Sequence, residues 1–184
     1  MHGPGVVRHT GRGDLIVGNM GGERLLSQTQ LEAIAATFVK AGVPCKVSDN
    51  VEGELWLKLL MNCAYNAVSA LGLSQYKRMA ASPEIVEVMK SVVREVLAVA
   101  QAACVRMPPG DLVEAACSLA DSMPEATSST AQDLARGKPS EIDHLNGFVF
   151  RRGQALGVPT PVNRTLHALV RLLERAASPR PGGA

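Results

Sequence analysis

Three polar side chains interrupt an otherwise apolar stretch of the chain at a constant spacing of four residues. Lys58, Asn62 and Asn66 lie within or beside residues 55–68, where most other side chains are apolar. Such a stretch is typical of a buried helix, and residues four apart on a helix fall on one stripe. Burying an ammonium group and two amides costs free energy unless they are paired. The spacing predicts a polar stripe lining a cleft, although polar residues satisfied at a helix–helix or subunit contact would give the same pattern.

A second set of polar groups lies further along the chain. Ser129 falls within the run Ser128-Ser129-Thr130 at an expected helix start, and Glu141 lies close to the start of the next helix. Hydroxyl groups at a helix start usually serve as caps, and an acidic residue in the first turn usually interacts with the helix dipole. These ordinary roles and a role in a shared site both remain open.

Together with the stripe, these groups could form one site that donates a proton and binds a small substrate. A desolvated lysine can donate a proton, and a nearby carboxylate would orient its ammonium group. Amide and hydroxyl groups can hold a small substrate by its oxygen atoms. Reduction of a 2-keto acid requires such groups, because a hydride reaches the carbonyl carbon while a proton is delivered to the carbonyl oxygen. Lys58 is therefore the candidate proton donor.

Other classes of site lack their sequence signatures. No Gly-x-Ser-x-Gly elbow is present and no histidine lies in a plausible partner segment for a serine nucleophile, which disfavours a hydrolase. The four histidines are scattered without ligand spacing, so we expect no metal site. The formal net charge is +2 and no basic run carries interleaved aromatic residues. Nucleic-acid binding is therefore disfavoured.

Composition favours packed helices in a soluble protein. Of the 184 residues, 46% are hydrophobic and 20% charged, whereas only 3% are aromatic. A sheet protein usually contains more aromatic and β-branched residues than this. No secretory leader, no apolar run long enough to span a bilayer and no Cys-x-x-Cys pair is evident. We therefore expect a reduced, cytoplasmic protein with no membrane partner.

The first fifty residues differ from the rest. Short strands are expected at 6–10, 15–19 and 45–47, the first two joined as a hairpin, and a capping box at Ser27-Gln30 opens a helix. These elements are typical of the end of an α/β sheet, so we interpret residues 1–49 as a remnant of an α/β domain. The Gly-x-Gly-x-x-Gly turn of a dinucleotide site is missing. The chain is therefore expected to begin late in, or after, any such domain.

Residues 50–177 are predicted to form a helical domain, followed by a disordered tail at 178–184 that is rich in proline and glycine. Helix caps, prolines and apolar spacing divide this domain into a series of helices. One of these helices is expected to run unbroken from residue 140 to Gly157. The predicted fold class is mainly α, preceded by the partial α/β unit.

At the residues of the stripe and its partners, the sequence resembles the ketopantoate reductase (2-dehydropantoate 2-reductase) family. The resemblance covers most of the chain and is carried by three stretches, GPGVVRHTGRGDLIVG, KLLMNCAYNAVSALG and SSTAQDLARGKPSEIDHLNGFVFRRGQALGVPTPVN. Members of the family have a leading Rossmann domain that binds NADPH. Their second, helical domain is similar to that of 6-phosphogluconate dehydrogenase and supplies the substrate side of the cleft.

The resemblance also implies a role for each candidate residue. Lys58 resembles the catalytic lysine that protonates the reduced carbonyl, and Glu141 matches the acidic residue that orients substrate and lysine. Asn62 and Asn66 resemble substrate-binding amides, and Ser129 is similar to the serine that contacts the substrate carboxylate.

By this resemblance, the expected function is NADPH-dependent reduction of ketopantoate to pantoate in pantothenate and coenzyme A synthesis. The expected partners are a small 2-keto acid and a second copy of the chain in a dimer. The loop at 73–76, Leu-Ser-Gln-Tyr, departs from the Asn-Gly-Glu-like segment of many members. Two alternatives stay open, a reductase of another small 2-keto acid and a catalytically silent helical module that oligomerises.

Overall fold

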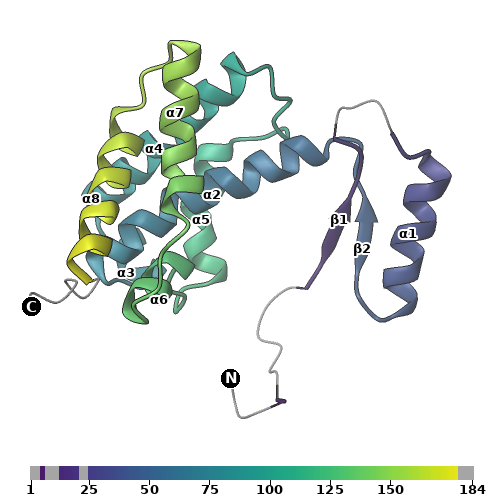
Figure 1. Ribbon diagram of the computed structural model, residues 1–184, viewed down its shortest axis with the longest axis horizontal. Coiled ribbons are helices and arrows are strands. Elements are labelled where there is room, and N and C mark those ends of the chain that lie inside the picture. Colours follow the sequence, from purple (N-terminus) through teal and green to yellow (C-terminus); the bar gives the residue numbers. More distant parts are fainter. Residues whose placement is uncertain (1–4, 7–12, 21–24, 178–184) are drawn as a thin grey trace, which may run out of the picture. The chain divides into compact units, whose positions relative to one another are not determined.

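The computed structural model describes residues 5–6, 13–20 and 25–177 (Figure 1). It divides into two compact units, residues 1–52 and 53–184, which are described separately below. Most of the strand expected at 6–10, the hairpin turn that would follow it and the tail at 178–184 lie outside the described residues. Those three expectations stay predictions.

The described part of the first unit is a strand–helix–strand arrangement. Strand β1 (Leu15–Val17) pairs in parallel with β2 (Cys45–Val47), and helix α1 (Gln28–Lys40) connects them. The capping box predicted at the start of α1 is confirmed, because the Ser27 and Gln30 side chains each bond the other's backbone N–H. The parallel pairing is typical of the α/β sheets that the sequence indicated.

This two-stranded sheet leaves apolar side chains exposed on both faces. Leu15 and Ile16 are adjacent in β1, so their side chains point to opposite faces of the sheet. They are 36% and 37% exposed. Parallel sheets usually occur with both faces covered, so the described part of this unit is an incomplete sheet.

The second unit is helical, as predicted (Figure 1). Three of its helices form the frame of the candidate site, α2 (Val51–Gly72), α6 (Ser129–Ala135) and α8 (Pro161–Ala177). The other elements are α3 (Tyr76–Ala80), α4 (Pro83–Ala102), α5 (Leu112–Ser122), the 3₁₀ turn η1 (Ile142–His144) and α7 (Asn146–Leu156).

The core of this unit surrounds the second half of α2. Between Leu60 and Ala70 almost every α2 side chain is buried, whereas Leu55 near the start is 47% exposed. The prediction that α2 is buried all round from residue 55 is therefore correct only beyond Leu60. Valines of α4, α7 and α8 pack against this half, and Tyr65 donates a hydrogen bond of 2.8 Å to the Ala116 carbonyl of α5.

The helix expected from residue 140 to Gly157 is broken in two. Turn η1 ends at His144, and Leu145 has φ −104° and ψ −106°, outside the helical region. The break allows the Asn146 side chain to enter the core, where its amide donates to the Cys63 carbonyl at 3.2 Å and to Asn163 Oδ1 at 2.9 Å. These buried hydrogen bonds offset the loss of helical ones.

A glutamate of α4 fixes the start of α8. The Glu95 carboxylate accepts hydrogen bonds from the backbone N–H groups of Val162 and Asn163 at 2.8 and 2.9 Å, and from the Asn163 amide at 2.7 Å. A carboxylate at this position satisfies unpaired N–H groups and interacts favourably with the helix dipole. In the described part of the chain, no helix has the length and apolar character to cross a membrane.

Candidate active site

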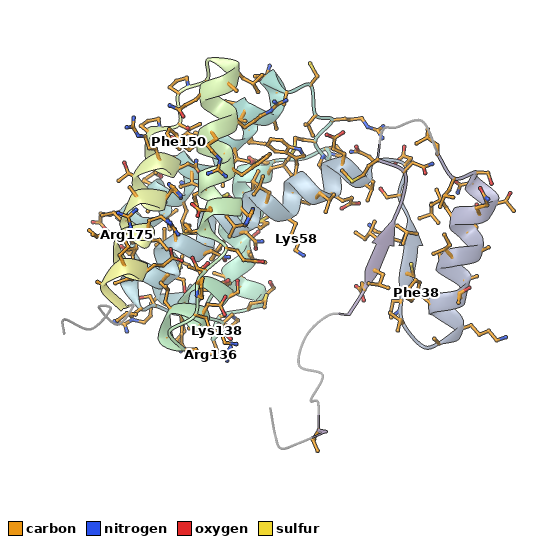
Figure 2. All side chains as sticks on the ribbon, in the orientation of Figure 1. Phe38, Lys58, Arg136, Lys138, Phe150 and Arg175 are labelled. Carbon is orange, nitrogen blue, oxygen red and sulfur yellow. The ribbon has the colours of Figure 1, made fainter. Side chains whose placement is uncertain are left out.

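Helix α2 carries the predicted polar stripe from the surface into the core. Lys58 is exposed, so the expectation of a desolvated lysine is wrong for this structure. Asn62 is half-buried, and Asn66 is buried, with 3% of its surface exposed. Figure 2 shows the Lys58 side chain extending away from the helix rather than into the bundle. Within the described residues, its ammonium group has no hydrogen-bonding or ionic partner.

The structure brings two of the predicted residues together at the inner end of the stripe. The Asn66 amide donates a hydrogen bond of 3.3 Å to Ser129 Oγ, although 63 positions separate the two residues. Both groups are uncharged, and Ser129 is exposed at the first position of α6. The Ser129 hydroxyl is therefore accessible from the solvent side, with the buried Asn66 amide hydrogen-bonded to it.

The neighbouring serine has the structural role that the sequence left open. Ser128 is the N-cap of α6: its hydroxyl accepts from the Ala131 N–H at 3.1 Å and donates to the Asn66 carbonyl at 3.1 Å. Its backbone N–H donates to Ser69 Oγ at 3.1 Å. Since these bonds attach the start of α6 to α2, Ser128 positions Ser129 and leaves the Ser129 hydroxyl without a capping role.

Among the described residues, Glu141 makes no hydrogen bond or ion pair with Lys58. It is exposed, it precedes η1, and its backbone carbonyl accepts the His144 N–H at 2.8 Å. Within the part of the chain that the structure describes, no ion pair joins the Glu141 carboxylate to the Lys58 ammonium. The structure thus joins Asn66 to Ser129 but does not pair Lys58 with Glu141, and a cleft shared by all of them stays a prediction.

A polar cluster on α8 positions the segment that carries Glu141. Asp143 Oδ1 lies 2.6 Å from His167 Nε2, and Asp143 Oδ2 lies 3.4 Å from Arg171 Nη1. On the other side of Glu141, Ser140 donates from its backbone N–H and its hydroxyl to Glu174 Oε1 at 2.8 and 2.6 Å. The chain on both sides of Glu141 is therefore attached to the same helix, through Ser140 and Asp143.

These contacts also lower the pKa values of two carboxyl groups, those of Asp143 and Glu174. The hydrogen bond from His167 lowers the pKa of Asp143, and the charge of Arg171 contributes. Burial raises the pKa of Glu174, but the hydrogen bonds from Ser140 and Arg171 outweigh it and the pKa lies below its ordinary value. Both carboxylates are thus held in their charged forms.

The sequence interpretation missed this cluster. It treated the histidines as scattered and considered α8 only for its apolar residues. The available signal was the spacing of His167, Arg171 and Glu174, at intervals of four and three residues, which places them on one face of a helix. Their partners, Ser140 and Asp143, lie one residue before and two residues after Glu141.

Residues 50–174 match the family described as ketopantoate reductase PanE/ApbA C terminal. The helical unit thus has the framework of the C-terminal part of such a reductase. The chain belongs to the ketopantoate reductase family, and both the resemblance and the mainly helical fold class predicted from the sequence are confirmed.

Curated relatives agree with this assignment. The chain is 36% identical over 144 residues to the 2-dehydropantoate 2-reductase of Pyrobaculum aerophilum, covering 78% of this chain and 51% of the relative. It is 33% identical over 170 residues to that of Mesorhizobium japonicum, covering 92% of this chain and 51% of the relative. The chain therefore spans about half the length of the curated relatives it matches.

Solved structures show the same correspondence. A PanE/ApbA family ketopantoate reductase from Ralstonia eutropha JMP134 superposes with a TM-score of 0.86 at 50% identity, covering 96% of this chain and 56% of that one. A D-mandelate dehydrogenase with NADH and anilino(oxo)acetate superposes with a TM-score of 0.78 at 22% identity, covering 88% and 52%, and shares the fold.

Proposed function

We propose that this chain supplies the substrate side of an NADPH-dependent reductase that converts ketopantoate to pantoate, a step of pantothenate and coenzyme A synthesis. Family membership supports the reaction class, and the contact between Asn66 and Ser129 is the observation that carries the proposal. It joins two side chains that the family resemblance assigns to one substrate. The contact brings together two residues that are 63 positions apart in the chain.

Each polar group has a distinct role in this proposal. Lys58 donates a proton to the carbonyl oxygen as hydride reaches the carbonyl carbon. Asn62 and Asn66 follow at intervals of about 6 Å along the α2 axis, which suits a small acid lying along the helix. Ser129 binds the carboxylate of that acid, and Glu141 orients the substrate and the ammonium group.

NADPH would supply the hydride, but the sequence of this chain lacks the glycine pattern of a dinucleotide-binding turn. The glycines after β1 are Gly18, Gly21 and Gly22, which is not the Gly-x-Gly-x-x-Gly pattern. Gly18 has a packing role instead, because a Cβ there would lie 2.4 Å from the Ser48 carbonyl oxygen. We therefore assign no cofactor-binding residue in this chain and place that role in a complete dinucleotide-binding domain.

The proposed assembly is a homodimer. The ketopantoate reductase of Staphylococcus aureus, a structural neighbour at 22% identity, is described as dimeric. That likeness shows the fold alone, so the dimer is an expectation for this chain, and sedimentation at several protein concentrations measures it directly.

The test of the proposal is NADPH oxidation with ketopantoate, using this chain joined to a complete dinucleotide-binding domain. We expect Lys58→Ala to lower kcat by at least about 10²-fold, because a positioned acid contributes on that scale. Lys77→Ala is the matched control, since Lys77 is an exposed lysine paired with Glu125 on the surface. Unchanged turnover in Lys58→Ala would remove this lysine from the mechanism.

A panel of 2-keto acids separates the alternatives. Turnover that is fastest with ketopantoate supports the proposed substrate, whereas a preference for another acid would assign a different reductase and direct attention to residues 73–76. Lack of turnover with every acid, in a folded protein that binds NADPH, would favour the silent oligomerisation module.

A further inference from the structure

A basic hollow lies between the loop after α6 and the last turns of α8. It has a volume of about 290 Å³ and is lined by Leu134, Gly137, Lys138, Pro139, Arg171, Glu174 and Arg175. We name it the α6–α8 hollow. None of the five candidate active-site residues lines it, although Arg171 and Glu174 also hold the residues on either side of Glu141.

Positive charge dominates the lining. Three cationic residues and one carboxylate leave an excess of two positive charges. Glu174 already accepts two hydrogen bonds from Ser140, and its other oxygen lies 2.9 Å from Arg171. Its charge is therefore directed at those partners. Within the described residues, Lys138 and Arg175 have no ionic partner (Figure 2).

The backbone on one side of the hollow is preorganised. Helix α6 ends in a Schellman motif, in which the Lys138 N–H donates to the Asp133 carbonyl at 2.8 Å and the Gly137 N–H to the Leu134 carbonyl at 3.0 Å. Gly137 has φ +65°, a conformation that glycine adopts at little cost. Pro139 then restricts the next backbone angle. Binding would thus require little ordering of the loop that carries Lys138.

We propose that the α6–α8 hollow binds a small organic phosphate. A phosphate monoester carries about two negative charges at neutral pH, which matches the two cations without ionic partners. Lysine and arginine are the side chains that most often bind phosphate oxygens. The hollow has a volume of about 290 Å³, and Leu134 and Pro139 offer apolar contact. An organic group attached to the phosphate would fill this space better than the free ion.

The test is titration calorimetry of the 184-residue chain at low ionic strength with phenyl phosphate and, separately, with inorganic phosphate. We expect saturable binding of phenyl phosphate that weakens as salt is added, because the interaction is electrostatic. Tighter binding of phenyl phosphate than of inorganic phosphate supports the organic monoester. Equal affinity would assign the hollow to free phosphate and overturn that part of the proposal.

Two double variants locate the site. Lys138→Ala/Arg175→Ala is expected to weaken binding at least about tenfold, since it removes both cations without ionic partners. Lys40→Ala/Arg94→Ala removes the same net charge from positions outside the hollow and is expected to bind as the parent does. All four side chains are exposed, so circular dichroism should report folded proteins. Equal affinity in the two variants, or no binding by the parent chain, would overturn the site.

Discussion

The contact between Asn66 and Ser129 joins a helix that the sequence singled out to a serine whose role was open. Residue types and spacing predicted the stripe on α2, because helical periodicity is a local property. They could not predict which serine meets it, since that depends on how α6 docks. The structure separates the two serines, with Ser128 as cap and Ser129 facing Asn66.

If this contact binds substrate, Ser129→Ala should act mainly on substrate affinity. The residue is exposed and its hydroxyl is not the α6 cap, so we expect KM for ketopantoate to rise about tenfold with the unfolding temperature nearly unchanged. Ser128→Ala is the contrasting variant, because it removes a buried cap and should lower the free energy of unfolding by about 1 kcal/mol. Steady-state kinetics and thermal unfolding measure the two effects. A stability loss in Ser129→Ala with KM unchanged would make Ser129 structural.

The carboxylates of Asp143 and Glu174 predict an acid-dependent stability. Because both have pKa values lowered below the ordinary 3.8 and 4.5, their contribution is present above those values and is lost as pH falls through the lowered ones. Thermal unfolding between pH 6 and pH 3 should show this decline.

Asp143→Asn provides the control for the acid dependence. Asparagine keeps the shape of the side chain but does not titrate, so the variant should be less stable at pH 6 and should lose less stability on acidification. A variant with the same pH dependence as the parent would exclude Asp143 as a source of it.

At the scale of elements, most helices could be predicted and their interruptions could not. Caps and prolines mark local backbone preferences, so the starts of α1, α4 and α8 follow from Ser27, Pro83 and Pro161. The break at Leu145 has no such mark. It depends on a buried hydrogen bond between Asn146 and Asn163, residues 17 positions apart on two packed helices.

The junction of α4 with α8 gives an element-scale prediction. Glu95→Ala leaves the Val162 and Asn163 N–H groups without their acceptor in a partly buried place, so we expect the free energy of unfolding to fall by about 1–3 kcal/mol. Glu95→Gln keeps an acceptor oxygen and should lose less. Denaturant unfolding of the three proteins measures the difference. Equal stability of Glu95→Ala and the parent would show that solvent replaces the carboxylate.

At the scale of the whole molecule, the family assignment explains the contrast between the two units. The match at residues 50–174 covers most of the helical unit, whereas the described residues of the first unit form two parallel strands and one helix. The sequence indicated this incompleteness from the missing glycine turn and the small number of strands. The helix between the two strands agrees with their parallel pairing, but the sequence could not indicate the register Leu15–Cys45, because register is a tertiary property.

Exposed apolar side chains on the first unit predict self-association of the isolated chain. We expect Val39→Glu, which charges a position 55% exposed on α1, to shift sedimentation toward the monomer. Leu172→Glu charges an exposed position on α8, at 64% exposure, and serves as the control. A shift in Leu172→Glu alone would place the association on α8, and a monomeric parent chain would contradict the expectation altogether.

The anchoring of α2 has a mechanical consequence. Tyr65 is tied to α5 by its hydroxyl group, and burial raises the pKa of that hydroxyl to about 12, so it stays a proton donor at any physiological pH. Lys58 lies seven residues earlier on the same continuous helix, about 10 Å away along the axis. The buried second half of α2 is therefore fixed in the core, and the rigid helix transmits that position to its exposed first half, which carries Lys58, the proposed acid. The position of the Lys58 side chain would then depend on core residues such as Tyr65, which are not among the proposed substrate-binding residues.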